Sequence, residues 1–340
     1  MTVRVGINGF GRIGRGFVRA AHAKGADIEV VAVNDLTDAA TNAHLLRFDT
    51  TQGRFAAEVA VVDDTIVVDG HPIKVLAERE PSAIPWQELG VEVVVESTGR
   101  FTSRAAAAAH LEGGAKRVVV SAPSGDADAT FVMGVNDDEF DPGTHKVVSN
   151  ASCTTNCFVP LVKVVDDAFG IVGGLMTTVH AYTNDQNLLD LTHRDLRRAR
   201  AAAQNIVPAS TGAARATSLV MAAMKGRLDG TALRVPVPDG SITDFTALVS
   251  GEVSAEQVNE AFRKAASDGP LAGYLVYSED PIVSSDIVGN PASCIFDSEL
   301  TMVMPIAGAG TLVKVLGWYD NEWGYANRMV DLVELVGAAR

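Results

Sequence analysis

The fold of the first half is decided by the segment Val3-Arg4-Val5-Gly6-Ile7-Asn8-Gly9-Phe10-Gly11-Arg12-Ile13-Gly14. It starts with a β-like run, passes through G-x-G-x-x-G, and leads into a helix-like segment that reaches Lys24-Gly25. Between a strand and a helix, such glycines allow a tight turn, close approach of the backbone to a pyrophosphate, and close helix–strand packing. The helix N-terminus then faces the phosphates. The segment therefore predicts a dinucleotide-binding sheet.

An acidic residue follows at the expected offset. A second strand over residues 28–33 leads into Asn34-Asp35, and Asp35 lies about 20 residues after Gly14. A carboxylate there binds the hydroxyls of the adenosine ribose and repels a 2′-phosphate, which favours NAD over NADP. A plain glycine-rich turn and a strand-end aspartate are the structural alternative. The order of strand, helix, strand and acid favours dinucleotide binding.

The remaining strands of the first half continue this pattern. Residues 56–75 alternate apolar residues with turn signals, which predicts inserted antiparallel hairpins. Further strands are predicted at 91–95, 118–120, 131–135 and 147–148, with a helix at 103–110. Ligands bind beyond the carboxyl ends of strands in such sheets, so residues directly after them are candidates for the cofactor cleft. They are Ser97, Thr98, Gly99 and Ser121.

The second half has a different pattern. Longer strands are predicted at 174–182, 233–237, 242–249, 293–304 and 311–319, with helices at 212–225 and 255–266. Strands that follow one another without helices between them indicate an antiparallel sheet. The predicted fold class is α/β, with a Rossmann-type doubly wound parallel sheet domain followed by an α+β catalytic domain with a largely antiparallel sheet.

Composition excludes several classes of protein. The chain has 340 residues and a formal net charge of −14, which argues against a nucleic-acid surface because such a surface needs a basic patch. No apolar run has the 18 or so residues of a membrane helix. The three cysteines are too few, and odd in number, for a disulfide framework. We therefore expect a cytoplasmic protein with no membrane or nucleic-acid partner.

The chemistry is centred on Ser149-Asn150-Ala151-Ser152-Cys153-Thr154-Thr155-Asn156-Cys157. The segment follows a strand and precedes a helix-like run that Gly170 can end, so Cys153 is expected at a helix N-terminus. The unpaired N–H groups and the dipole there favour a thiolate, the nucleophilic form of cysteine. A packed core cysteine is the alternative. From this segment alone both interpretations stand.

Four further features are candidates for chemistry in the second half. His180 closes a predicted strand, although a histidine at a strand end is most often structural. Residues 182–204 form a long polar, basic loop, and loops of that length are usually functional or interfacial. Ser210-Thr211-Gly212 starts a helix with hydroxyl groups, as an anion site does. Arg234 lies on an apolar strand, where it needs a carboxylate or a phosphate as partner.

At Asn150–Cys157 the chain resembles the glyceraldehyde-3-phosphate dehydrogenase family, and the resemblance covers essentially the full length. Other matching motifs lie at residues 7–15, 96–99, 180–186, 195–200, 210–214, 233–236 and 318–322. The resemblance implies a phosphorylating aldehyde dehydrogenase that uses NAD and no metal. Glyceraldehyde 3-phosphate and inorganic phosphate would give 1,3-bisphosphoglycerate through a thiohemiacetal and a thioester on Cys153.

The resemblance also implies a role for each site residue. Cys153 would be the nucleophile and His180 the base. Thr183 and Arg234 would bind the substrate phosphate, and the attacking phosphate would be bound by Ser152, Thr154, Thr211 and Gly212. The implied NAD-binding residues are Gly9, Phe10, Gly11, Arg12, Ile13, Gly14, Asp35, Arg79, Ser97, Thr98, Ser121, Asn321 and Tyr325. Cys157, one helical turn after Cys153, is interpreted as a structural thiol.

The implied organisation is an NAD-binding domain over residues 1–152 and 321–340 and a catalytic domain over 153–320, in a homotetramer whose long basic loop lines a neighbouring subunit's cofactor site. Three alternatives stay open. They are a relative that acts on erythrose 4-phosphate, a reductase of the aspartate-semialdehyde type, and a catalytically silent NAD-binding regulator.

Overall fold

The computed structural model describes residues 2–339 and divides the chain into two compact units. The first comprises Met1–Phe131, Asp137–Ser152 and Ala326–Arg340, and the second comprises Val132–Asn136 and Cys153–Tyr325. The terminal residues of the predicted NAD-binding domain, 1 and 340, lie outside the described part. Within residues 2–339, no helix is both long and apolar enough to span a membrane.

The first unit is built on a nine-stranded sheet in the order β10-β11-β9-β8-β1-β2-β7-β6-β5. All neighbours are parallel except β5–β6 and β6–β7, which form the predicted hairpins. The strand order reverses at β1, between β8 and β2, so the predicted doubly wound sheet is confirmed. The strands are β1 (Val3–Asn8), β2 (Ile28–Asn34), β5 (Val59–Val62), β6 (Thr65–Val68), β7 (His71–Leu76), β8 (Val93–Glu96), β9 (Arg117–Val120), β10 (Ala129–Thr130) and β11 (Val147–Ser149).

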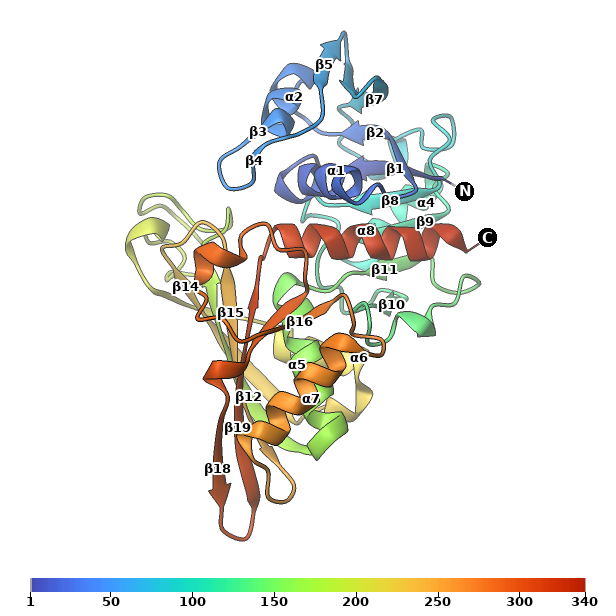
Figure 1. Cartoon of the computed structure of the whole chain (residues 1–340). Helices are drawn as coiled ribbons and strands as arrows, with labels where there is room; N and C mark the ends of the chain where they lie inside the picture. Colours follow the sequence, from blue (N-terminus) through green and yellow to red (C-terminus); the bar gives the residue numbers. More distant parts are fainter. Residues whose placement is uncertain (1, 340) are drawn as a thin grey trace. The chain divides into compact units, whose positions relative to one another are not determined.

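Helices cover this sheet. The long ones are α1 (Arg12–Lys24), α2 (Ala39–Arg47) and α8 (Trp323–Ala338), and the short ones are α3 (Arg104–Ala107) and α4 (Ala109–Glu112). Figure 1 shows α1 and α8 side by side, and Lys24 on α1 forms an ion pair with Asp331 on α8. The buried residues of α8 include Met329, Val330, Leu332, Val333 and Val336. Small elements complete the unit, namely β3 (Phe48–Asp49), β4 (Gly53–Arg54), η1 (Pro81–Ala83) and η2 (Asp137–Glu139).

The second unit contains an eight-stranded sheet in the order β13-β14-β12-β15-β19-β17-β16, with β18 on β19. Only β12–β14 and β16–β17 are parallel, so the predicted, largely antiparallel sheet is confirmed. The strands are β12 (Ile171–Ala181), β13 (Val207–Ser210), β14 (Leu228–Val235), β15 (Ser241–Val249), β16 (Leu275–Ser278), β17 (Cys294–Asp297), β18 (Met302–Ile306) and β19 (Gly310–Tyr319).

One hydrophobic core joins this sheet to its helices. The helices are α5 (Cys153–Phe169), α6 (Ala213–Val220) and α7 (Ala255–Ser267), with 3-10 turns η3 (Ala202–Gln204), η4 (Ala222–Met224), η5 (Ser284–Ile287) and η6 (Ser298–Leu300). Buried residues alternate along β15, so one face of the sheet meets the helices. Phe158 packs edge-on against Phe245, and Phe262 stacks on Phe296. The predicted Ser254–Gln257 capping box starts α7.

Among the predicted elements that were wrong in extent, three differ most from the structure. Residues 131–135 form a turn after β10, because Asn136 accepts the Val132 N–H and Gly134 has a φ of +80°. The predicted strand 293–304 splits into β17 and β18, since the two pair with opposite ends of β19 and the chain leaves the edge between them. The predicted helix 212–225 ends as α6 at Val220 and continues as the turn η4. Strands β13 and β16 were not predicted.

Two buried carboxyl groups lie at the ends of paired strands in the second unit. Asp239 precedes β15 and Asp320 follows β19, and Ser241 is opposite Tyr319 in that pairing. Asp320 accepts N–H groups of three residues, Gly289, Glu322 and Trp323. Burial and the negative charge of Asp320 raise the pKa of Asp239 to about 9, so Asp239 is protonated at neutral pH.

We expect the Asp239→Asn variant to be more stable than wild type at pH 8. Between the ordinary aspartate pKa of 3.8 and the folded value of about 9, the folded state holds a proton that the unfolded chain releases. Stability therefore falls as pH rises through this window, and a neutral amide removes that loss. The melting temperature at pH 8 should rise by about 2–5 °C. The exposed Asp280→Asn is the control, and an unchanged or lower melting temperature for Asp239→Asn contradicts this prediction.

Candidate active site

A strained turn leads into the helix that bears Cys153. Ala151 has a φ of +53°, a left-handed conformation that residues other than glycine rarely adopt. Its N–H donates to the hydroxyl of Ser149 at 3.0 Å. Helix α5 then begins at Cys153, as the sequence predicts. The backbone N–H of Cys153 belongs to the first turn and has no acceptor within the helix, so it is available to an anion.

The sulfur of Cys153 lies within hydrogen-bond reach of His180. The distance from Sγ to Nε2 of the imidazole is 3.4 Å. His180 is almost fully buried near the end of β12, and Cys153 is half-buried. A thiol beside an imidazole in this geometry is the arrangement of a nucleophile and its base.

The other imidazole nitrogen, Nδ1, lies close to one hydrogen-bond acceptor and one hydrogen-bond donor. Nδ1 of His180 lies 2.6 Å from the carbonyl oxygen of Ala181 and 2.7 Å from Nη1 of Arg234. A carbonyl only accepts and a guanidinium only donates, so these neighbours favour different tautomers. With Nδ1–H on Ala181, Nε2 can accept the thiol proton. With Nδ1 accepting from Arg234, Nε2–H can donate to sulfur or to an oxyanion.

Burial moves the two pKa values apart. It raises the pKa of the Cys153 thiol to about 11, although the charge of Arg234 and the N–H of Thr154 oppose the shift. Burial, together with Arg234, lowers the pKa of His180 to about 3. The thiol and the imidazole are therefore both neutral at pH 7. Burial thus acts against the predicted thiolate bias, because it raises the pKa of Cys153 by more than Arg234 and the Thr154 N–H lower it.

Tyr319, which was not predicted as a site residue, packs next to this pair. The hydroxyl of Tyr319 is 2.9 Å from Oγ1 of Thr154 and 2.7 Å from Oγ1 of Thr178, and its ring packs edge-on against the His180 ring. The predicted phosphate ligand Thr154 is thus buried with its hydroxyl on Tyr319. The sequence signals for Tyr319 were its place at the end of a long strand and within the matching motif at 318–322.

Arg234 is one of three groups around the carboxylate of Asp185. Thr183 and Arg198 both bond to Asp185, and Nη2 of Arg234 lies 3.9 Å from it. Burial alone would raise the pKa of Asp185, but the Thr183 hydroxyl and the two arginines lower it overall. The structure thus brings together the predicted substrate-phosphate ligands Thr183 and Arg234 around one carboxylate. It adds Arg198, for which the basic character of the 182–204 loop and the matching motif at 195–200 were the signals.

The predicted anion site at Thr211 lies next to this cluster. The Ala213 N–H donates to the Thr211 hydroxyl at 3.1 Å, and Gly212 caps α6. Arg198 donates to the carbonyl of Ser210 at 3.3 Å, which connects Thr211 to the arginine cluster through the chain. A cavity of about 480 Å³ is lined by Arg197, Ser210, Thr211, Arg215 and other residues.

Asn321 has its amide orientation set by neighbours. The hydroxyl of Ser241 accepts the Ala181 N–H at 3.0 Å and donates to Oδ1 of Asn321 at 2.7 Å. A hydrogen-bonded path therefore runs from the end of the His180 strand to Asn321. Tyr325 is buried at the start of α8.

The first unit holds a cavity at the predicted dinucleotide turn. Gly9 has a φ of +90°, and a Cβ there would lie 2.6 Å from the Thr98 nitrogen. A Cβ on Gly11 would meet nothing within 4 Å, which leaves the close approach that a pyrophosphate needs. The cavity has about 300 Å³. Its lining contains six of the predicted residues, Gly9, Gly11, Asp35, Arg79, Ser97 and Thr98, together with Asn8, Asn34, Leu36, Glu78, Arg100 and Phe101, which were not predicted.

Asp35 is held in place by two backbone groups. Oδ2 accepts the Phe10 N–H at 2.9 Å, and Oδ1 accepts the Thr37 N–H at 2.9 Å. Each oxygen keeps a lone pair for a ribose hydroxyl. The carboxylate, the glycine turn and the start of α1 therefore fit a dinucleotide. The cavity lining does not include the predicted Phe10, Arg12, Ile13, Gly14 and Ser121.

Cys157 lies apart from these reactive groups. Cys157 is fully buried with its thiol on the Gly317 carbonyl at 3.4 Å, as expected for a structural thiol. In the described part of the chain, no group of three or more His, Cys, Asp or Glu side chains is placed to hold a metal ion.

We expect His180→Asn to slow the alkylation of Cys153 by iodoacetamide at pH 7 by at least about tenfold. The neutral thiol then lacks the base at 3.4 Å that takes its proton. The rate is measured by mass spectrometry of the Cys153 peptide, with the exposed His71→Asn as control. Equal rates in wild type and His180→Asn contradict a proton transfer between the pair.

Comparison with known proteins covers both units. A model of the glyceraldehyde 3-phosphate dehydrogenase C-terminal domain matches residues 152–321, and a model of the NAD binding domain of that enzyme matches residues 3–104. Glyceraldehyde-3-phosphate dehydrogenase of Streptomyces coelicolor is 64% identical over 337 residues, with 99% of each chain covered. The protein of that name from Mycobacterium tuberculosis is 61% identical over 343 residues, again with 99% of each covered. On this evidence, the chain belongs to the glyceraldehyde-3-phosphate dehydrogenase family.

Proposed function

We propose that this protein oxidises glyceraldehyde 3-phosphate, with NAD and inorganic phosphate, to 1,3-bisphosphoglycerate. The observation that carries the proposal is the 3.4 Å approach of the Cys153 sulfur to His180, with Arg234 on the other side of the imidazole. High identity to named dehydrogenases over the full chain supports the same activity.

Cys153 and His180 carry the first step. The sulfur bonds to the aldehyde carbon, the thiol proton passes to Nε2 of His180, and the carbonyl electrons move to oxygen. The oxyanion accepts hydrogen bonds from Nε2–H and from the backbone N–H of Cys153. NAD, when bound, accepts the hydride that leaves this carbon.

The same two residues complete the reaction. Loss of the hydride re-forms the carbonyl, so Cys153 carries a thioester while His180 keeps the proton. A phosphate oxygen then attacks the thioester carbon and gives its own proton to solvent. The C–S bond breaks, the acyl phosphate leaves, and His180 returns its proton to the sulfur. Water must be kept from the thioester, because hydrolysis would compete with the attack by phosphate. The burial of His180 favours the exclusion of water.

Two anion sites bind the phosphate groups of this reaction in our proposal. Thr183 and Arg234 bind the substrate phosphate, because a guanidinium can bond two phosphate oxygens at once. They now hold the carboxylate of Asp185, so the arriving phosphate has to compete with that carboxylate. Ser152, Thr154, Thr211 and the backbone at Gly212 bind the attacking phosphate. Thr154 would first have to share its hydroxyl with Tyr319.

The requirement for phosphate separates this function from its nearest rival. A relative that acts on erythrose 4-phosphate and releases a free acid needs no phosphate. The test mixes the protein with NAD and glyceraldehyde 3-phosphate and follows NADH absorbance with and without phosphate or arsenate. Turnover that is indifferent to both anions contradicts the proposal, and an absence of turnover with every substrate supports the silent NAD-binding regulator.

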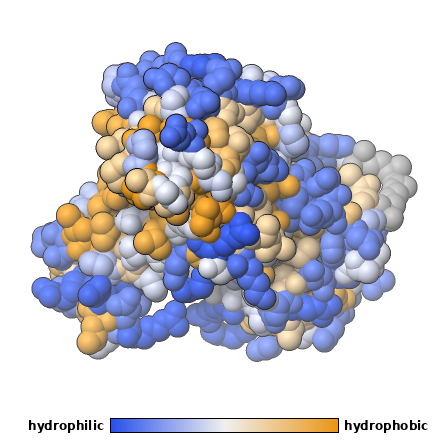
Figure 2. Space-filling model, turned by 90° about the horizontal axis from the view of Figure 1, so that it is seen from below, coloured by the Kyte–Doolittle hydropathy of each residue, from blue (hydrophilic) through white to orange (hydrophobic). Residues whose placement is uncertain are grey.

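We also propose a cytoplasmic homotetramer. Large apolar side chains remain exposed in the basic loop and on the sheet of the second unit, and Figure 2 shows hydrophobic patches between hydrophilic ones on the face seen from below. The exposed apolar side chains include Leu188, Leu189, Leu191 and Leu196 in the loop and Leu175, Met302 and Met304 on the strands. Burial of such side chains against other copies would favour assembly. The three free thiols suit a reducing compartment.

We expect Cys153→Ser to abolish turnover and to leave NAD binding intact. Serine lacks the nucleophilicity of sulfur, whereas the glycine turn and Asp35 belong to the first unit and keep their contacts. NADH formation and NAD titration calorimetry are measured on the same preparation, with Cys294→Ser as control. Retained turnover would show that Cys153 is not the nucleophile.

We expect catalytic efficiency with NAD to exceed that with NADP by about tenfold or more, since a 2′-phosphate would face the Asp35 carboxylate. Asp35→Ser should reduce this ratio, mainly by weakening NAD binding. The comparison needs steady-state rates with each dinucleotide. A preference of the wild type for NADP would overturn the assignment.

A further inference from the structure

A buried carboxylate lies behind the dinucleotide cavity without being part of its lining. Glu96 is the last residue of β8, next to Ser97 and Thr98, and only 2% of its surface is exposed. A buried carboxylate is costly unless hydrogen bonds replace its water. The reaction proposed above does not use this residue.

Every partner of Glu96 is a hydrogen-bond donor. Oε1 accepts the backbone N–H of Thr98 at 2.8 Å and also its hydroxyl, and that hydroxyl in turn accepts the Arg100 N–H at 3.1 Å. Oε2 accepts from Nδ2 of Asn8 at 2.6 Å and lies 2.9 Å from Nε2 of His110. No partner offers a proton acceptor, so the cluster fits the ionised carboxylate.

Trp86 sets the tautomer of His110. Its indole Nε1–H lies 3.1 Å from Nδ1 of His110, and an indole nitrogen only donates. Nδ1 must therefore accept, which leaves the imidazole proton on Nε2, directed at Glu96. Both aromatic side chains are fully buried. His110 is thus a neutral donor, and Glu96 carries the one negative charge of this cluster.

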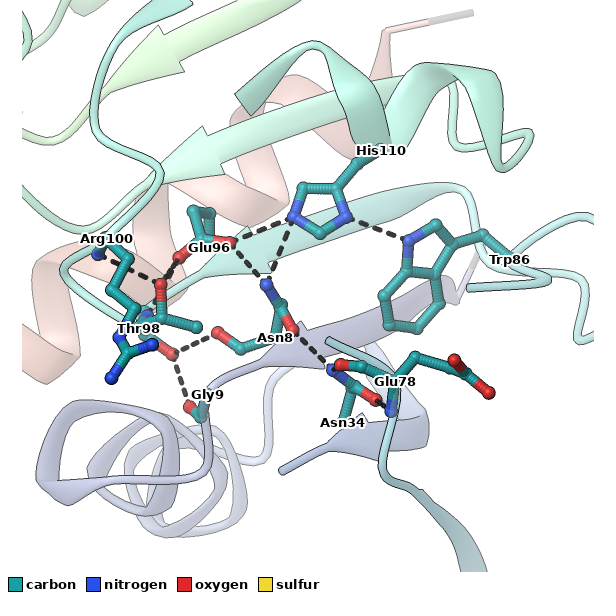
Figure 3. Close-up of polar contacts among 10 residues, drawn as sticks. Asn8, Gly9, Asn34, Glu78, Trp86, Glu96, Thr98, Arg100 and His110 are labelled. Atoms are coloured by element: carbon teal, nitrogen blue, oxygen red, sulfur yellow. Dashed lines mark hydrogen bonds and ion pairs between the residues drawn. The ribbon is translucent and has the colours of Figure 1, made fainter. Parts of the chain in front are cut away.

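Two amides in series extend from Glu96, as Figure 3 shows. Because Glu96 only accepts, Asn8 must direct its NH₂ group at Glu96 and its Oδ1 at Asn34, 2.7 Å away. Asn34 directs its NH₂ group at Oδ1 of Asn8 and at the Glu78 carbonyl, 2.8 Å away, and the backbone of Glu78 by itself already requires this orientation. Its own Oδ1 accepts the Glu78 N–H at 2.7 Å. Neither amide can flip without opposing two donors or two acceptors.

The path joins opposite walls of the cavity. Glu78 and Arg79 line one wall, after β7, and Thr98 and Arg100 line the other, after β8. Strand β1 lies between β2 and β8, so Asn8 is the only side chain of the path that reaches both Glu96 and Asn34. Backbone pairing joins the strands to one another, whereas this path joins the segments that follow β7 and β8.

We propose that Glu96 is a positioning residue for the dinucleotide. Its buried negative charge orients Asn8, and the hydrogen bonds between Asn8, Asn34 and Glu78 then hold the Glu78 wall of the cavity at a fixed spacing from the Thr98 wall. The proposal rests on the proposed function only in that the cavity binds NAD. Glu96 acts on the affinity for the dinucleotide and not on the chemistry at Cys153.

The first comparison is wild type against Glu96→Gln. The Gln NH₂ group must oppose either the Thr98 donors or those of Asn8 and His110, so the path loses its single orientation. We expect the dissociation constant for NAD, and that for ADP-ribose, to rise about tenfold to a hundredfold by titration calorimetry. The turnover number at saturating NAD should stay within about threefold of wild type, as expected when only uniform binding is lost.

The second comparison introduces Glu96→Gln into a variant in which it should strengthen NAD binding instead of weakening it. Asn8→Asp alone places a second carboxylate against Glu96 and should weaken NAD binding. Adding Glu96→Gln to Asn8→Asp restores a donor opposite an acceptor, and His110, 3.4 Å from the amide of residue 8, can donate to the new carboxylate. The double variant should therefore bind NAD more tightly than Asn8→Asp. Any direct effect of residue 8 on NAD is present in both proteins and cancels.

Glu92→Gln is the matched control, because this half-buried acid precedes the same strand, pairs with Lys116 and lies outside the cavity lining. The proposal is overturned if wild type binds NAD and Glu96→Gln binds it equally well. It is also overturned if Glu96→Gln weakens binding in the Asn8→Asp background. Should the single Glu96→Gln variant not fold, the second comparison decides. Failure of the proposed function is distinguishable, since wild type itself would then bind no NAD.

Discussion

The parallel pairing of β12 with β14 is the constraint on which the catalytic chemistry depends. It places His180 opposite Arg234, so a buried base always has a guanidinium beside it. Arg234 lowers the pKa of His180 and opposes the rise in the pKa of Cys153. The same arginine faces Asp185, where we propose that the substrate phosphate binds. A shift of this register by one residue would turn the arginine to the other face of the sheet.

Burial and charge act against each other at this site. The dry environment keeps the thiol and the imidazole neutral in the free chain, and the helix start and Arg234 favour the ionised sulfur without outweighing burial. Such a pair has its nucleophile protected until a substrate arrives. In the proposed reaction the proton passes between a sulfur and a nitrogen only 3.4 Å apart, and the developing oxyanion meets donors that are already in place.

Local signals account for what could be predicted. The glycine turn before α1, the acid at residue 35 and the helix start at Cys153 each depend on residues close in sequence, and all three were found where expected. Elements that depend on distant partners were the ones misjudged. The segment 293–304 looked like one strand, but pairing with both ends of β19 divides it, and short β16 forms only because β17 is there to pair with it.

The site shows the same division. Residue types and motifs identified Cys153, His180 and Arg234 as candidates, but no pattern in the sequence placed Tyr319 under Thr154 or Arg198 beside Asp185. Nor could it connect Trp86, Glu96 and His110, which lie on separate elements and share only one buried carboxylate. The sequence by itself determined the two sheets, the dinucleotide turn and the helix start at Cys153, because backbone conformation and residue chemistry are local. Only the tertiary structure decided which donors meet which acceptors and how far burial shifts their protons, because both depend on neighbours that folding brings together.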